Sequence, residues 1–295
     1  MKKKLLKLLA LLAVLFVVLI VVVLVWIDSI ARKGIEVGAT ATLGVNTTLK
    51  DINIGIFSGK VSMHALEVAN PSGFKGSHFM KLGDGRVAVT LGSLMGDTVE
   101  VGELALSDIE VSMEKKDGKA NYQAILDNLK KGETAGAGGG TSGGASGGKK
   151  FVIRELLIRN VVVNADVLPV GGPLKLTVPE IRLKNVGTGA GGSVDMKELV
   201  NVIMKAVFAS IFDAGKNILP GDVLGEMGKG LDGLKSLGSM GVGVVGEMGK
   251  NLGEGVTKAV GENVGKAADE AGKNLEKGVG DIGKGIGDLF GGEKK

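Results

Sequence analysis

The sequence predicts a mainly β (α+β) protein with an N-terminal transmembrane helix, a twisted antiparallel meander or groove of repeated strands with covering helices, and a C-terminal glycine-rich amphipathic helix. Three observations predict it: a charge-free apolar run near the N-terminus, an apolar spacing that recurs four times, and a glycine-rich C-terminal part. The expected segments are an anchor (1–33), a β-rich module in two parts (34–131 and 151–190), a Gly/Ser-rich flexible linker between them (132–150), an amphipathic helix (191–219) and a low-complexity amphipathic tail (220–295).

The anchor is predicted from Leu8–Ile27, 20 consecutive residues without a charge. A helix of that length spans roughly 30 Å, the thickness of the hydrocarbon core of a bilayer. A cleaved signal peptide is the alternative, because Ser29-Ile30-Ala31 has the small-x-small pattern of a cleavage site. Lysines at positions 2, 3, 4 and 7 favour a cytoplasmic N-terminus, which leaves the bulk of the chain on the far side of the membrane.

The charge of the chain argues against nucleic acid as a partner. The net charge is +4, and the four lysines among the first seven residues account for all of it. The remainder therefore carries no excess of cations to bind phosphate backbones. The chain has no cysteine, which excludes disulfides, thiol chemistry and a lipoprotein anchor.

The strands are predicted from an alternation of apolar residues that is broken by three-residue steps. The spacing in 99–111 is repeated in 151–163; 61–68 matches its first half, and 176–186 matches most of it. Alternation indicates strands with one buried face, and each odd step needs a bulge or short turn to keep the apolar set on that face. Four copies predict a repeated strand unit in which each strand lies beside its neighbours.

Turn and helix signals surround these strands. Asn70-Pro71-Ser72-Gly73 predicts a turn directly after the strand that carries His64. Asn121 is a candidate cap for a short helix whose apolar stripe has helical spacing: Tyr122, Ile125, Leu126 and Leu129. Asp195 and Glu198 form a capping-box signature for a second helix, which runs towards Pro220 through Leu199, Ile203, Val207 and Ile211.

The tail from Gly221 has apolar residues about 3.67 positions apart, the spacing of an eleven-residue helical repeat. Glycine, however, makes up 22 of its 75 residues. That content disfavours an isolated helix by roughly 20 kcal/mol relative to alanine. We therefore expect the tail to fold only against a membrane, a lipid or another chain; a spacer that never orders is the alternative.

No catalytic, cofactor-binding or metal-binding residues are predicted. His64 and His78 lack a second ligand at metal spacing, and His64 is expected on the solvent side of its strand, with His78 in the following loop. The partial nucleotide motifs in 138–149 lie in the glycine-rich linker, without the strand and helix that such motifs need. An enzyme is therefore not expected, and no cofactor is implied.

Several stretches together resemble a known family. They are the N-terminal anchor, "GVNTTLKDINIGIFSGKVSMHALEVANPSGF", "VEVGELALSDIEVSMEKKDGKANYQAIL" and "FVIRELLIRNVVVNADV". The order resembles the AsmA-like proteins of Gram-negative envelopes, distant relatives of TamB and the repeating β-groove lipid-transfer proteins. The resemblance covers roughly residues 5–215. It implies an inner-membrane anchor, a periplasmic β-rich groove, and a role in outer-membrane assembly or lipid movement.

Two functions therefore remain open. In the first, the apolar sheet face binds phospholipid or supports envelope assembly, and its lipid-facing candidates are Val61, Met63, Leu66, Val68, Val101, Leu104, Leu106, Ile153, Leu156 and Ile158. The same residues also suit an ordinary core under the two helices. In the second, the β part is a spacer and the tail helix binds another envelope protein or a second copy of the chain. A lipid binder should expose its apolar strand face, whereas a scaffold should bury it.

Overall fold

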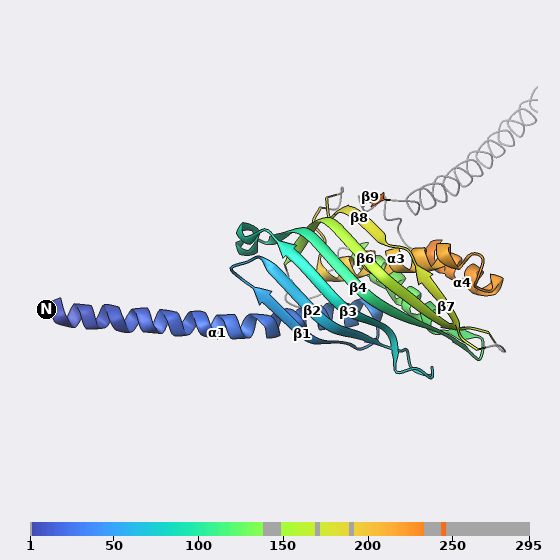
Figure 1. The fold of residues 1–295 in the computed structure, drawn as a ribbon, viewed down its shortest axis with the longest axis horizontal. Coiled ribbons are helices and arrows are strands. Elements are labelled where there is room, and N and C mark those ends of the chain that lie inside the picture. The colour runs from blue at the N-terminus through green and yellow to red at the C-terminus, as the bar shows by residue number, and fades with distance from the viewer. Residues whose placement is uncertain (1, 138–148, 169–171, 189–191, 233–242, 246–295) are drawn as a thin grey trace, which may run out of the picture. The chain divides into compact units, whose positions relative to one another are not determined.

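The computed structural model describes residues 2–137, 149–168, 172–188, 192–232 and 243–245 (Figure 1). The helices are α1 (Lys2–Leu43), α2 (Asn121–Ala137), α3 (Met196–Gly215) and α4 (Gly221–Asp232), with a short 3₁₀ helix η1 (Leu91–Met95). The strands are β1 (Thr47–Gly55), β2 (Lys60–Ala69), β3 (His78–Val89), β4 (Thr98–Lys116), β5 (Lys119–Ala120), β6 (Lys150–Asp166), β7 (Leu174–Val178), β8 (Ile181–Val186) and β9 (Gly243–Val245).

The strands form one mixed, mostly antiparallel sheet in the order β1-β2-β3-β4-β6-β8-β9, with β5 paired to β4 and β7 paired to β6. The pair β4–β6 is parallel. A parallel pair needs a crossover connection, and α2 with the glycine-rich linker provides it. The prediction of an antiparallel meander is therefore wrong at this pair, although the sheet and its covering helices were correctly predicted.

One three-residue step in each of β2, β4 and β6 contains a residue in the left-handed backbone region. Ala65 of β2, Asp108 of β4 and Asn160 of β6 have φ of 52°, 59° and 52°. They form one row across the sheet, in which Gly83 of β3 lies between Ala65 and Asp108. A Cβ on Gly83 would lie 2.9 Å from the Cβ of Asp108, so the row needs glycine there. Because the regular pairing is interrupted at the same level in neighbouring strands, the strands pair in register before and after this row.

A second row of breaks crosses the other half of the sheet. Gly102 of β4 lies opposite Arg154 of β6, and Asn185 of β8, with φ of 59°, is on the other side of Arg154. Each break places an extra residue on the outer face and leaves the apolar residues on the inner face. The prediction that each three-residue step needs a local irregularity to keep the apolar residues on one face is therefore confirmed.

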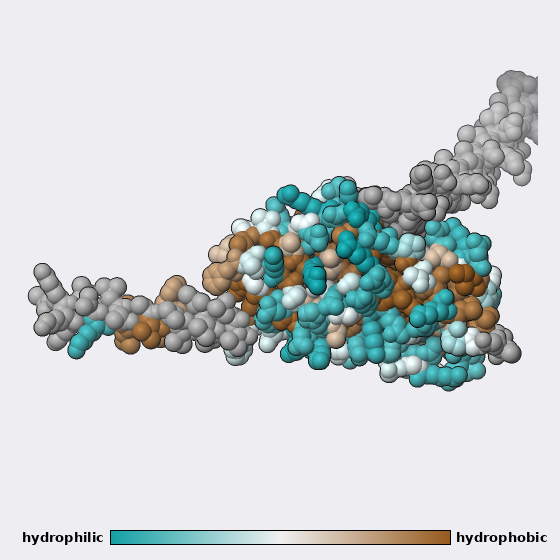
Figure 2. Space-filling view, viewed as in Figure 1, coloured by the Kyte–Doolittle hydropathy of each residue, from teal (hydrophilic) through white to brown (hydrophobic). Residues whose placement is uncertain are grey.

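Of the described helices, α2, α3 and α4 lie on one side of the sheet, and the last part of α1 lies along the edge strand β1 while the rest extends away from the sheet (Figure 1). The helix predicted at Asn121 is α2, and its four stripe residues are buried. The capping box of α3 is present between Asp195 and Glu198, and Phe208 of α3 packs on Phe79 of β3 with ring centroids 5.9 Å apart. The opposite face of the sheet is largely hydrophilic (Figure 2). The core therefore lies between one sheet face and the helices.

The first part of the predicted tail is a folded element of the module. Val223 and Met227 of α4 are fully buried, and α4 packs against α2 and α3. Residues 243–245, which fall in the predicted long helix, instead pair with β8 as strand β9. The long-helix prediction is wrong at these residues because hydrogen bonding to the free edge of β8 competes with the helical repeat. Residues 233–242 and 246–295 lie outside the described residues, as do most of the linker residues.

Helix α1 continues ten residues past the predicted end of the anchor, to Leu43. Gly44 ends it with φ of 69°, and the amide of Asn128 in α2 donates to the carbonyl of Leu43 at 2.9 Å. In the part of the chain whose side chains are described, no helix is long and apolar enough to cross a membrane. Residues 17–25, in the middle of the predicted span, have side chains outside that part, so the anchor stays a prediction.

Candidate functional site

The last third of α1 is hydrogen-bonded along the edge strand β1. Asp28 Oδ1 accepts from the N–H of Ile54, Glu36 Oε1 accepts from the N–H of Leu49, and both distances are 3.0 Å. Two further bonds, each also 3.0 Å, come from Arg32 to the carbonyl of Lys50 and from the N–H of Thr47 to Thr40. The four helix residues are four positions apart, and residues at that spacing share one helix face. Their side chains replace a neighbouring strand and protect the sheet edge.

A small polar hollow lies at the start of this junction, with a volume of about 130 Å³. Its lining residues come from α1 and β1: Asp28, Ser29, Arg32, Asp51 and Ile52. A pocket for a drug-sized ligand is usually about 300–1,000 Å³ and mainly apolar. The hollow is therefore too small and too polar to hold an acyl chain.

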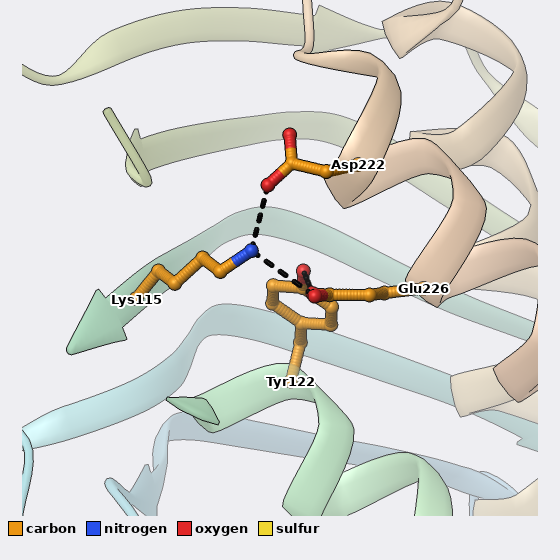
Figure 3. Close-up of polar contacts among 4 residues, drawn as sticks. All are labelled: Lys115, Tyr122, Asp222 and Glu226. Carbon is orange, nitrogen blue, oxygen red and sulfur yellow. Dashed lines mark hydrogen bonds and ion pairs between the residues drawn. The ribbon is translucent and has the colours of Figure 1, made fainter. Parts of the chain in front are cut away.

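A second polar cluster joins α4 to the sheet and to α2 (Figure 3). Lys115 near the end of β4 lies between the two carboxylates of α4, with its Nζ 2.7 Å from Asp222 and 3.0 Å from Glu226. The hydroxyl of Tyr122, at the start of α2, donates to the second oxygen of Glu226 at 2.7 Å. The cluster therefore links α4 to two elements, β4 and α2, that lie about a hundred residues earlier in the chain.

The surroundings of this cluster change the protonation of its members. Burial raises the pKa of the Tyr122 phenol far above its ordinary value, and the hydrogen bond to the Glu226 carboxylate raises it further. Hydrogen bonds to Asp222 and Glu226 raise the pKa of Lys115, and the bond from Lys115 lowers the pKa of Asp222. The lysine and the phenol therefore keep their protons near neutral pH, and the cluster holds α4 against β4 and α2.

A third cluster fixes the loop that the sequence predicted as a turn. Asn70 and the backbone N–H groups of Lys75 and Gly76 donate to the carboxylate of Glu114, at 2.8–2.9 Å. Asn121 donates to Asn70 at 3.0 Å, and its amide oxygen accepts from the N–H of Glu114 at 2.8 Å. Asn121 was predicted to cap its own helix, but its side chain bonds to β4 instead. The cluster is structural, because the Glu114 carboxylate holds the loop and Asn121 ties Asn70 to β4.

The predicted lipid-facing residues do share one face of the sheet, and that face is covered. Eight are buried in the core: Leu66, Val68, Val101, Leu104, Leu106, Ile153, Leu156 and Ile158. Val61 and Met63 are half-buried. The face lies under the helices as an ordinary core, which was the alternative for these residues. Any lipid contact there would require a helix to move away.

The histidines lie apart from these clusters. His64 is on the outer sheet face with its side chain 54% exposed, as predicted, and its Nδ1 is 2.5 Å from Asp84 Oδ1. His78 was expected in a loop but is the first residue of β3. Among the described residues, no three His, Asp or Glu side chains gather as a metal site. No protein-family model matches the chain, and no curated protein matches its sequence.

The two junctions, α1–β1 and α4–β4, were not predicted from the sequence. Asp28, Arg32 and Glu36 carry a signal that could have revealed the first, because polar residues four positions apart follow directly after an apolar helix. The second carries no local signal, because Lys115 and Glu226 meet only through the tertiary fold. The candidate functional feature of the protein is therefore mechanical: a sheet module to which the first and the last of the described helices are bonded.

Proposed function

We propose that the protein is a non-enzymatic, membrane-anchored scaffold of the cell envelope. In this proposal α1 anchors the chain in the inner membrane with its N-terminus in the cytoplasm. The sheet module stands in the periplasm and holds the glycine-rich C-terminal segment, which binds another envelope protein or a second copy. The observation that carries the proposal is that α1 and α4 are both fixed to the sheet by side-chain bonds, so a force on one is transmitted to the other.

The exposure of the apolar part of α1 supports the anchor. Its described large side chains are 55–65% exposed: Leu11, Leu12, Val14, Leu15 and Phe16. At 100° per residue these five side chains cover about 200° of the helix circumference. Contact with lipid would remove this apolar surface from water, as in a membrane-spanning helix. The resemblance to the AsmA-like proteins agrees with this arrangement and remains a resemblance.

Lipid binding by the sheet face is the second candidate, and the composition of α4 favours it. Gly225, Gly228 and Gly230 cost α4 about 3 kcal/mol of helix stability relative to alanine. The helix is therefore held by its buried residues and by the bonds of its carboxylates to Lys115 and Tyr122, rather than by its own helix propensity. A helix of this kind is suited to leave the module, which would expose the parts of α2 and α3 that it covers and begin to open a path to the sheet face.

Native mass spectrometry of a fragment that begins at Asp28, purified without detergent, separates the two functions. The fragment keeps the residues of α1 that bond to β1. The scaffold predicts a lipid-free mass. Stoichiometric phospholipid that is lost in a folded Leu104→Asp variant would instead favour the lipid carrier. Complementation of a deletion strain adds a cellular readout: a chain that ends at Val245 fails if the scaffold is right and succeeds if the sheet module alone carries the function.

A further inference from the structure

Two loops at one end of the sheet expose large apolar side chains. Phe57 in the β1–β2 turn is 83% exposed, and Met95 and Leu91 of η1 are 92% and 44% exposed. We call these three residues the apolar tip. Outside α1, the only other large apolar side chain that is exposed among the described residues is Ile218. The gathering of three such residues at one end is therefore a feature of the loops rather than of the surface in general.

The two loops are neighbours. Lys60, which follows the β1–β2 turn, pairs with Ala88 near the end of β3, and the N–H of Val89 donates to the carbonyl of Gly59 at 2.7 Å. A Cβ on Gly59 would lie 3.4 Å from the side chain of Leu91. Figure 2 shows hydrophobic surface at this end of the module, where η1 lies in Figure 1.

The apolar tip lies at the end of the sheet that is nearest to the C-terminal end of the predicted membrane span in α1. Helix α1 runs antiparallel to β1, because Glu36 bonds to Leu49 whereas Asp28 bonds to Ile54. The predicted span ends at Ile27, one residue before this last contact. Phe57 follows Ile54 by three residues in the direction of the span. The tip is therefore level with the end of the span.

Three lysines lie near the apolar tip, where Asp97 is also exposed. Lys60 and Lys150 are exposed at the starts of β2 and β6. The ammonium of Lys149 donates to the carbonyls of Leu94 and Gly96, at 3.2 and 2.5 Å, and thereby fixes the C-terminal end of η1. Apolar side chains flanked by lysines are the pattern of a surface that enters the headgroup region of an anionic membrane.

We propose that the apolar tip inserts into the surface of the same bilayer that holds α1, so that the sheet module rests on the membrane with this end down. The proposal rests on the membrane anchoring of the proposed function. It adds a second contact with lipid, formed by Phe57, Leu91 and Met95. With α1 bonded along β1, a second contact restricts tilting of the module about the anchor.

Depth-dependent quenching by brominated phospholipids tests the contact in the full chain. Trp26 is the one tryptophan of the chain and lies at the end of the predicted span, so the wild-type protein reports on the anchor. The variant W26F/F57W reports on the apolar tip. The variant W26F/S72W is the matched control, because Ser72 is exposed in the loop at the other end of β2. All three are reconstituted into phosphatidylcholine–phosphatidylglycerol vesicles, and circular dichroism confirms their fold.

The fluorescence of the wild-type protein and of W26F/F57W is expected to be quenched at least twofold by lipids brominated near the headgroup, whereas that of W26F/S72W is unchanged. Loss of anionic lipid should weaken the quenching of W26F/F57W more than that of the wild type. Quenching of the wild type without quenching of W26F/F57W overturns the insertion of the tip and leaves the anchor intact. If neither the wild type nor W26F/F57W is quenched, both the membrane anchoring of α1 and the insertion of the tip are contradicted.

Discussion

Raising the pH should weaken, through Tyr122, the bonds that hold α4. This is the only tyrosine in the chain, and it is fully buried with its hydroxyl on Glu226. Its pKa in the folded protein lies far above the ordinary value of about 10. A folded pKa that is raised gives stability that is fully present below pH 10 and is lost as the pH rises towards the folded value.

The size of the effect follows from the linkage between protonation and folding. At pH 11 the phenol is mostly ionised in the unfolded chain and still protonated in the folded chain. The free energy of unfolding should therefore fall by about 1.4 kcal/mol for each pH unit above 10. The Tyr122→Phe variant loses the bond to Glu226 and should be less stable by about 2 kcal/mol at pH 8. The difference in free energy of unfolding between wild type and variant should be about 1.4 kcal/mol smaller at pH 11 than at pH 8. The titration of Lys115 and the other lysines occurs in both proteins and does not contribute to this change.

Two measurements test this prediction. Tyrosinate absorbance follows the ionisation of Tyr122 alone, and denaturant unfolding at pH 8–11 gives the stability of wild type and Tyr122→Phe. Tyrosinate should appear only as the protein unfolds. Ionisation near pH 10 in a protein that keeps its native circular dichroism would refute the burial of Tyr122 and its bond to Glu226. A difference in free energy of unfolding that stays constant from pH 8 to 11 would contradict the linkage in the same way.

Two further predictions concern the sheet. Glu36→Ala leaves the N–H of Leu49 without its acceptor and should lower the free energy of unfolding by about 1–2 kcal/mol. Glu36→Gln keeps an acceptor and should lower it by less than half as much. Equal losses of stability in a denaturant titration would argue against the bond. Ala65→Val places a β-branched residue at φ of 52° and should destabilise by about 1–2 kcal/mol despite the strand preference of valine. Ala105→Val on β4 is the control, because Ala105 is not in the left-handed region, and it should change stability by less than about 0.5 kcal/mol. Equal loss of stability in the two variants would contradict the left-handed conformation of Ala65.

The elements that the sequence predicted well are those whose pattern is local. The spacing of 99–111 and 151–163 gave the strands and their inner face, and the stripe from Tyr122 to Leu129 gave α2. Which strands become neighbours was not predictable in this way. Residue alternation determines the face of a strand, but β4 and β6 are parallel because of the crossover through α2. Strand β3 was missed because Gly83 and Asp84 interrupt its apolar alternation.

The two junctions were missed because the partners of their charged residues are distant in sequence. Asp28 and Arg32 directly follow the predicted span, and nothing in the local sequence indicates that β1 is their partner. The glycines of α4 argued correctly against an isolated helix, but the sequence could not reveal that Lys115 would bind two of its carboxylates. Ten apolar residues were assigned to one face, and whether helices or lipid cover that face depends on contacts distant in sequence.

The docking of α4 is central to the proposed scaffold, because α4 joins the module to the C-terminal segment. A Cβ on Gly230 would lie 3.6 Å from the Cβ of Leu126 in α2, within the range of about 3.5–4.5 Å that a disulfide requires. Because the chain has no cysteine, the pair Leu126→Cys/Gly230→Cys can be introduced without a competing thiol. Gly225→Cys with Leu126→Cys is the control, because Gly225 is exposed and a Cβ there would contact nothing within 4 Å.

The most direct measurement is the extent of this cross-link in the full-length chain in membranes, under a mild oxidant. A docked α4 predicts nearly complete oxidation of the 126–230 pair and little of the 126–225 pair. If both pairs stay reduced, or both oxidise at the same slow rate, α4 does not rest on α2. The fixed attachment of α4 to the module, on which the scaffold depends, would then be contradicted.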